Sequence, residues 1–274
     1  MSQSLNQGEI RLSAKWVTRG IAILVAFLAA AHSAVFIAKK AFALEPSEMH
    51  GLMGFFDMGS EANLPTFCSA AMLMFSAMLL ALIASGSSAE SKRMRLGWWI
   101  LAAGFFLLSL DEVAQLHEGV VGELILNIDL FSGLPFYGWF LIYLPLLAVL
   151  TVVYLPFLKK LPRQTAVRFV LAGAVYLGGA IGVETFEGFI AKSMGDSANF
   201  GILAISRLIE ETAEMAGVLL FIRALLIYAA ERNIATQVSV TPPATQRAVR
   251  PIADSAASWK SAPAATPPQT AGVA

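Results

Sequence analysis

The sequence predicts an all-α fold, a polytopic membrane bundle of about six transmembrane helices with both termini in the cytoplasm. The chain of 274 residues is 57% hydrophobic and only 14% charged, with a mean hydropathy of +0.68. Such a composition is typical of polytopic membrane proteins rather than soluble ones. Six apolar segments are long enough to cross a hydrocarbon core about 30 Å thick, which takes about 20 residues. The basic residues are concentrated in alternate loops.

The six predicted spans alternate with loops. They cover about 17–38, 65–85, 97–121, 136–157, 167–190 and 203–229. Asn63 and Pro65 predict the start of the second span, because a side-chain cap and an early proline suit the first turn of a helix.

Two tails flank the predicted transmembrane domain of residues 17–230. Residues 1–16 form a short cytoplasmic tail. Residues 231–274 are rich in Ala, Pro, Ser and Thr, so they cannot bury a core and are predicted to be a disordered cytoplasmic tail. A cleaved signal peptide is the alternative for the first span, but its apolar stretch is longer than the usual 7–15 or so residues of such signals.

The distribution of Lys and Arg predicts the orientation. Fourteen of these nineteen residues fall in the two tails, the 86–96 loop and the 158–168 region, whereas the opposite loops carry only Lys39, Lys40 and Lys192. Because cytoplasmic loops carry an excess of Lys and Arg, we expect both termini to be cytoplasmic. We also expect a bacterial cytoplasmic (inner) membrane location.

With this orientation, the acidic residues gather on the periplasmic side. Fifteen of nineteen acids and all three histidines lie there. The third span has only fourteen residues, 97–110, before Asp111, or about 21 Å at 1.5 Å per residue. Asp111 and Glu112 are therefore predicted to lie below the outer surface, where carboxylates are costly and usually functional.

Helical spacing predicts that these acids share faces. Asp111, Gln115 and Glu118 fall on one stripe of the third span, with Glu112 beside it. Similar spacings occur on the fifth and sixth spans: Glu184 and Glu187; Arg207, Glu210, Glu211 and Glu214. Small residues would let another helix approach the fifth span closely: Gly178, Gly179 and Gly182.

A structural role is the alternative for the acids of the sixth span. Glu210, Glu211 and Glu214 lie near a predicted helix start, where the macrodipole favours anions. Arg207 can also pair with Glu210 or Glu211 along the helix. The acids of the third and fifth spans lie toward helix C-termini instead, so they are predicted to need a cation, a proton or Arg207 as compensation.

The residue types predict a hard-cation site. The predicted metal ligands are Asp111, Glu112, Glu118, Glu211 and Glu214. His117 is predicted as a further ligand or general base, whereas His32 is explained equally well as a core residue. The predicted supporting residues are Glu61, Gln115, Glu184, Glu187, Arg207 and Glu210. Oxygen ligands suit Mg²⁺ or Mn²⁺, with Fe or Zn as alternatives, although the Glu-x-x-His motif of dimetal bundles is missing.

Three segments resemble those of an uncharacterised family of bacterial multi-pass membrane proteins. They are FDMGSEANLPTF at 56–67, LSLDEVAQLHE at 108–118 and LIEETAEMAG at 208–217. The resemblance covers most of the membrane region but not the C-terminal tail, and it implies a six-helix membrane protein with no established activity. It emphasises these residues: Glu61, Asp111, Glu112, His117, Glu118, Glu211 and Glu214.

Three functions fit these observations. The leading hypothesis is a membrane-embedded divalent-metal-binding protein, with catalysis at the outer leaflet left open. An ion- or proton-coupled transporter is the first alternative, because buried carboxylates can relay protons. A membrane assembly or interaction protein is the second. The expected partners are the lipid bilayer and either another copy of the chain or a membrane partner protein, and the zero net charge gives no indication of nucleic-acid binding.

Overall fold

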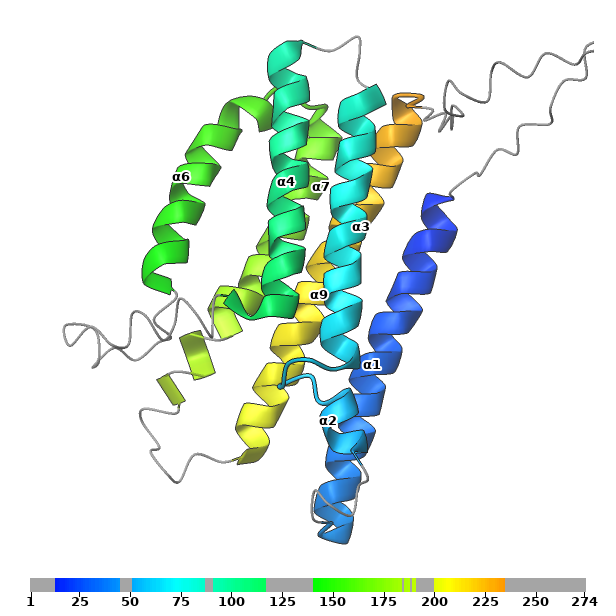
Figure 1. Cartoon of the computed structure of the whole chain (residues 1–274), viewed down its shortest axis with the longest axis vertical. Helices are drawn as coiled ribbons and strands as arrows, with labels where there is room; N and C mark the ends of the chain where they lie inside the picture. The colour runs from blue at the N-terminus through cyan, green and yellow to red at the C-terminus, as the bar shows by residue number, and fades with distance from the viewer. Residues whose placement is uncertain are drawn as a thin grey trace, which may run out of the picture. The chain divides into compact units, whose positions relative to one another are not determined.

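A computed structural model of the chain describes residues 13–44, 51–86, 91–116, 140–183, 185–187, 189–190 and 200–234. They all belong to the unit Met1–Thr236. The helices are α1 (Ala14–Phe42), α2 (Leu52–Phe56), α3 (Leu64–Gly86), α4 (Lys92–Ala114), α6 (Phe140–Leu158), α7 (Arg163–Leu177), the π-helical turn η3 (Gly178–Val183) and α9 (Phe200–Glu231). Figure 1 shows the long helices running side by side.

The structure confirms an all-α polytopic bundle, and its described residues contain no strand. Five described stretches are long and apolar enough to cross a membrane: Ala14–Phe42, Leu64–Gly86, Lys92–Ala114, Arg163–Glu187 and Ala204–Glu231. At the fourth predicted span, α6 contains a shorter apolar stretch, Leu144–Leu158. Residues 1–12 of the first predicted tail and most of the second tail lie outside the described residues, and residues 14–16 of the first already belong to α1.

The start of α3 agrees with the sequence, because α3 begins at Leu64 and Asn63 caps it. The side-chain oxygen of Asn63 accepts a hydrogen bond from the backbone N–H of Thr66 at 3.1 Å. This bond satisfies one of the N–H groups that have no partner in the first turn of a helix.

The end of α4 differs from the prediction. The third span was expected to continue to about residue 121, but α4 ends at Ala114. Gln115 adopts the left-handed conformation (φ 54°, ψ 41°), and its N–H donates to the carbonyl of Asp111 at 2.8 Å. A left-handed residue redirects the chain, so the expected stripe of Asp111, Gln115 and Glu118 does not continue along one α-helix.

Helix α9 organises the packing, since it contacts α1, α3, α7 and η3, while α3 packs along α4. One face of α9 is buried through Met215, Ile222 and Leu225. Near the start of α4, the fully buried ring of Trp98 contacts the rings of Phe157, Phe169 and Tyr228, with centroids 4.9, 6.1 and 5.0 Å away. This cluster joins α4, α6, α7 and α9.

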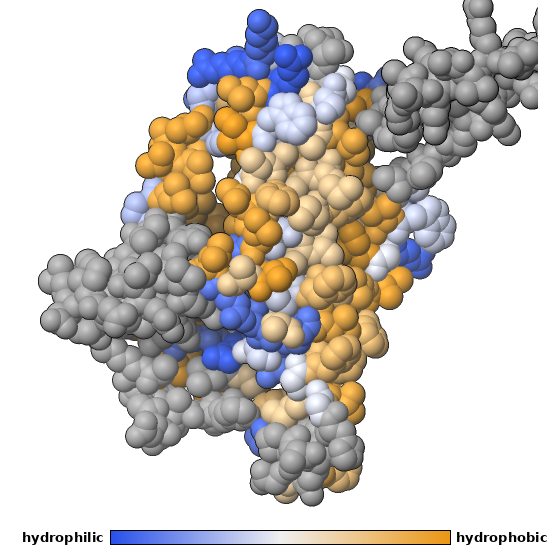
Figure 2. Space-filling model, in the orientation of Figure 1, coloured by the Kyte–Doolittle hydropathy of each residue, from blue (hydrophilic) through white to orange (hydrophobic). Residues whose placement is uncertain are grey.

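The outer surface of the bundle is apolar along much of its length. Large side chains point outward from α1, α4, α6 and α7, among them Ile23, Leu107, Val152 and Leu171, which are 63, 61, 66 and 57% exposed. Figure 2 shows this surface in orange, with hydrophilic residues at the start of α4 and again near the level where α4 ends. Such an exposed apolar band suits lipid rather than water.

Candidate functional site

Acidic residues of two helices converge near Tyr176 of α7. The half-buried Tyr176 side chain lies within electrostatic range of four carboxylates: Glu214, Glu112, Glu211 and Asp111. Asp111 and Glu112 come from the last turn of α4, and Glu211 and Glu214 come from α9. All four are partly buried. The structure thus brings together four residues that the sequence singled out on two separate spans.

Two glycines allow the close approach of α7 and η3 to α9. A Cβ on Gly179 would lie 2.8 Å from the carbonyl oxygen of Glu210, and one on Gly217 would lie 2.6 Å from the backbone nitrogen of Tyr176. Of the three glycines predicted for this role, only Gly179 is in contact; Gly178 and Gly182 have nothing within 4 Å of a Cβ. Gly217 was not predicted, although Ala213 four residues earlier forms the spacing of two small residues that often marks a helix contact.

A buried carboxylate lies beside the start of α9. Glu187 is 3% exposed, and its Oε1 accepts a hydrogen bond from the Ser206 hydroxyl at 2.6 Å. Its Oε2 lies 3.7 Å from Nε of Arg207. Charged side chains of this kind are rarely buried unless they are paired, and this carboxylate has both a neutral and a cationic partner.

The structure selects between the two roles that the sequence left open for Arg207. Its carboxylate partner among the described residues is Glu187 of the fifth predicted span, rather than Glu210 or Glu211 of its own helix. The acids of α9 were also expected to lie near a helix start, but α9 begins at Phe200. Glu210 lies about three turns into the helix, beyond the first turn in which the macrodipole acts. The helix dipole does not explain the acids of α9.

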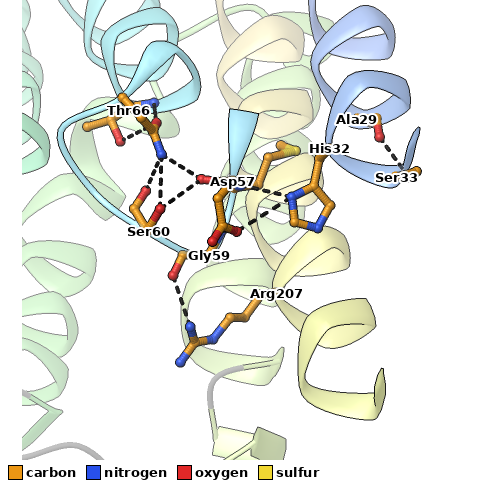
Figure 3. A network of polar contacts seen from close by, with 10 residues as sticks. Ala29, His32, Ser33, Asp57, Gly59, Ser60, Thr66 and Arg207 are labelled. Atoms are coloured by element: carbon orange, nitrogen blue, oxygen red, sulfur yellow. Dashed lines mark hydrogen bonds and ion pairs between the residues drawn. The ribbon is translucent and has the colours of Figure 1, made fainter. Parts of the chain in front are cut away.

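A second polar group lies between α1, the loop after α2, and α9 (Figure 3). His32 is 7% exposed; its Nδ1 accepts the backbone N–H of Met58 at 3.0 Å and lies 3.6 Å from Oδ1 of Asp57. Nη1 of Arg207 donates to the carbonyl oxygen of Gly59 at 2.9 Å. The same loop holds Glu61, whose Oε2 accepts a bond from the Thr66 hydroxyl at 3.3 Å.

Sequence reasoning missed Asp57 as a site residue and left His32 open. The available signal was the FDMGSEANLPTF segment, whose first residues carry Asp57 and Met58. A loop position gives no periodicity from which its contacts can be worked out. His32 is indeed a buried histidine with its Nδ1 hydrogen-bonded, but it is also part of a polar group formed by three segments.

Part of the predicted site lies outside the described residues, namely His117, Glu118 and Glu184. Gln115, the left-handed residue after α4, is partly buried. Within the portion of the chain that the structure describes, no three His, Cys, Asp or Glu side chains are arranged to hold a metal ion. The described geometry therefore shows a convergence of carboxylates, and it does not show a metal centre.

An apolar cavity of about 240 Å³ has Tyr176 among its lining residues. Its walls come from α3, α4, α6, α7 and α9 and include Leu101, Phe105, Phe169 and Phe221. The Tyr176 phenol therefore borders both the carboxylates and an apolar space inside the bundle.

Residues 20–229 match the family described as Domain of unknown function (DUF8692). The chain belongs to the DUF8692 family. No curated protein and no solved structure matches it.

The DUF8692 match contains both polar groups described above. It begins in α1, twelve residues before His32, and ends in α9, fifteen residues after Glu214. The family assignment agrees with the resemblance to an uncharacterised family.

Proposed function

We propose that this protein is an integral membrane protein that binds a divalent cation through the carboxylates near Tyr176. The observation that supports the proposal is their convergence, since two acids from α4 and two from α9 lie within electrostatic range of the Tyr176 phenol. Carboxylate oxygens are the preferred ligands of hard cations such as Mg²⁺ and Mn²⁺. Fe and Zn are the other metals that the sequence leaves open.

The proposed ligand set extends beyond the described residues. Asp111, Glu112, Glu211 and Glu214 supply oxygen atoms, and Glu118 and His117 follow α4 closely in the sequence. We assign Glu118 as an additional ligand and His117 as a ligand or general base. Among the supporting residues, Glu187 connects its segment to α9 through the Ser206 hydroxyl and the Arg207 guanidinium.

We further propose that the site faces the periplasm from a bacterial inner membrane. The basic residues of the 86–96 loop and the start of α7 lie at the end of the bundle opposite the carboxylates. Because basic loops mark the cytoplasmic side, the carboxylates belong to the outer half. Their depth supports a functional role, since acids inside a membrane are costly to retain.

The apolar cavity favours an amphipathic ligand over a transported ion. An ion crossing the bundle from the carboxylates would next meet Phe105, Phe169 and Phe221, which line the cavity. Aromatic and aliphatic walls offer no ligands to a desolvated ion, whereas they suit the apolar tail of a lipid-like molecule. If the protein is an enzyme, we expect its substrate to have a polar head at the cation and a tail in the cavity.

A metal inventory of the purified protein tests the proposal. Full-length protein in detergent is dialysed against a mixture of Mg²⁺, Mn²⁺, Fe²⁺ and Zn²⁺, washed and measured by plasma mass spectrometry. We expect wild type to retain a stoichiometric metal and Glu214→Gln to lose most of it. Glu231→Gln is the matched control, because Glu231 is an exposed acid on the same helix, paired with Arg168 at 3.4 Å. Equal and negligible metal in all three proteins would refute the proposal.

A further inference from the structure

A small pocket of about 180 Å³ lies beside His32, between α1, the segment after α2, and α9. Val35, Phe36 and Met53 form an apolar wall, and His32, Asp57 and Arg207 provide the polar groups. The volume is below the about 300–1,000 Å³ of pockets that hold drug-sized ligands. The pocket therefore suits a small polar group rather than a ring cofactor.

His32 presents a hydrogen-bond donor to this pocket. Its Nδ1 accepts the N–H of Met58 at 3.0 Å, so the proton of the neutral ring is on Nε2. The residue is 7% exposed, and among the described residues Nε2 has no hydrogen-bond partner. Figure 3 shows this nitrogen on the side of the ring away from Asp57. An N–H group with no acceptor in the protein can donate to a ligand.

Arg207 and Asp57 add one positive and one negative charge. The guanidinium of Arg207 has five N–H donors, of which the structure directs one at Gly59 and one toward Glu187. The Arg207 side chain is 47% exposed, so its other N–H groups are available to a ligand. The carboxylate of Asp57 accepts the N–H of Gly59 at 3.0 Å and is 34% exposed, so it can accept another donor. A ligand with both an anionic and a cationic group fits this pair.

The pocket lies at the depth of lipid headgroups. His32 follows Trp16 by sixteen residues on α1 and Arg207 precedes Glu231 by twenty-four on α9, or about 24 and 36 Å at 1.5 Å per residue. With a core about 30 Å thick, His32 lies about 6 Å inside the far boundary and Arg207 about 6 Å beyond it, so the pocket straddles this boundary. The nearby surface carries exposed apolar side chains, Ile37, Leu52 and Phe55, which are 63, 53 and 50% exposed.

We propose that this pocket binds the phosphoethanolamine headgroup of a membrane phospholipid. The phosphate oxygens accept hydrogen bonds from Nε2 of His32 and from Arg207, and the ammonium group donates to Asp57. The acyl chains continue over the apolar surface of α1 and α2. A glycerol headgroup would leave Asp57 without a cation, and a choline headgroup has no N–H to donate to it. This inference does not depend on the proposed metal site.

Lipid binding to the full-length protein in detergent tests the headgroup. Short-chain phosphatidylethanolamine, phosphatidylglycerol and phosphatidylcholine are titrated separately, with binding followed by native mass spectrometry. We expect wild type to bind phosphatidylethanolamine about tenfold more tightly than the other two, which corresponds to about 1.4 kcal/mol. Equal affinities for the three lipids would overturn the proposal. Free phosphoethanolamine binding as tightly as the lipid would overturn the assignment to a membrane lipid.

Variants separate the two ends of the headgroup. Asp57→Asn keeps an oxygen for the Gly59 N–H but removes the charge, so we expect the preference for ethanolamine to disappear while phosphate binding remains. Arg207→Gln should weaken binding of all three lipids about tenfold, because a charge-assisted hydrogen bond is lost. Arg168→Gln is the control, since its ion pair with Glu231 lies at the far end of α9. If Arg207→Gln does not fold, an unchanged lipid preference in Asp57→Asn is sufficient to reject the proposal.

Discussion

Replacing Gly217 with alanine tests whether close contact between α7 and α9 holds the carboxylates near Tyr176. The added Cβ would lie 2.6 Å from the Tyr176 backbone nitrogen, 2.8 Å from its Cα and 2.7 Å from its Cβ. Two of these three atoms belong to the backbone, so a side-chain rotation cannot remove the clash and the two helices must separate.

The size of the effect follows from two opposing terms. Overpacking at a tight contact costs about 1–3 kcal/mol, whereas alanine is favoured over glycine inside a helix by up to about 1 kcal/mol. We expect Gly217→Ala to destabilise the protein by about 1–2 kcal/mol. Gly178→Ala is the matched control, because Gly178 is helical (φ −65°, ψ −36°) and its Cβ would meet nothing within 4 Å. This variant should be neutral or more stable by up to about 1 kcal/mol.

Equilibrium unfolding in mixed detergent micelles, followed by circular dichroism, measures both variants. The expected result is a difference of about 2 kcal/mol between Gly217→Ala and Gly178→Ala. A Gly217→Ala protein as stable as the Gly178→Ala control would refute the argument, because the helices would then have room for a methyl group where the structure places backbone atoms.

Three other substitutions have clear expectations in the same unfolding assay. Trp98→Ala removes a fully buried ring that joins four helices and should cost about 3–5 kcal/mol; a loss under about 1 kcal/mol would contradict the packing. Ser206→Ala removes the 2.6 Å hydrogen bond to buried Glu187 and should cost about 1–3 kcal/mol, whereas no change would show that the bond is not needed. Glu231→Gln breaks an exposed ion pair with Arg168 and should cost less than about 1 kcal/mol.

The all-α bundle was predictable because a bilayer restricts the chain strongly. Every backbone polar group in the hydrocarbon core must be paired within the protein, which makes long apolar segments helical. The start of α3 was predictable as well, because the capping by Asn63 is local in sequence. Features of this kind depend on a few neighbouring residues and need no knowledge of which helices touch.

The end of α4 could not be predicted in this way, and the sequence left the partner of Arg207 open between two sets of acids. Gln115 takes a left-handed conformation that glycine or asparagine usually occupies, so the sequence contains no ordinary stop signal. Arg207 has acids three and four residues further along its helix, but it pairs with Glu187 of another segment. Local spacing gives possible partners; the packing of α9 against its neighbours selects among them.

The two polar groups lie at different depths on the same long helix. Glu214 precedes Glu231 by seventeen residues, or about 26 Å along α9, and Arg207 lies about 36 Å from that end. In a core about 30 Å thick, Glu214 is inside the boundary and Arg207 is beyond it. A carboxylate inside the boundary has lost most of its water and suits a bound cation, while Arg207 is at the level where lipid phosphates lie. The length of α9 thus separates a proposed cation site from a proposed headgroup site by about 10 Å, or two turns of one helix.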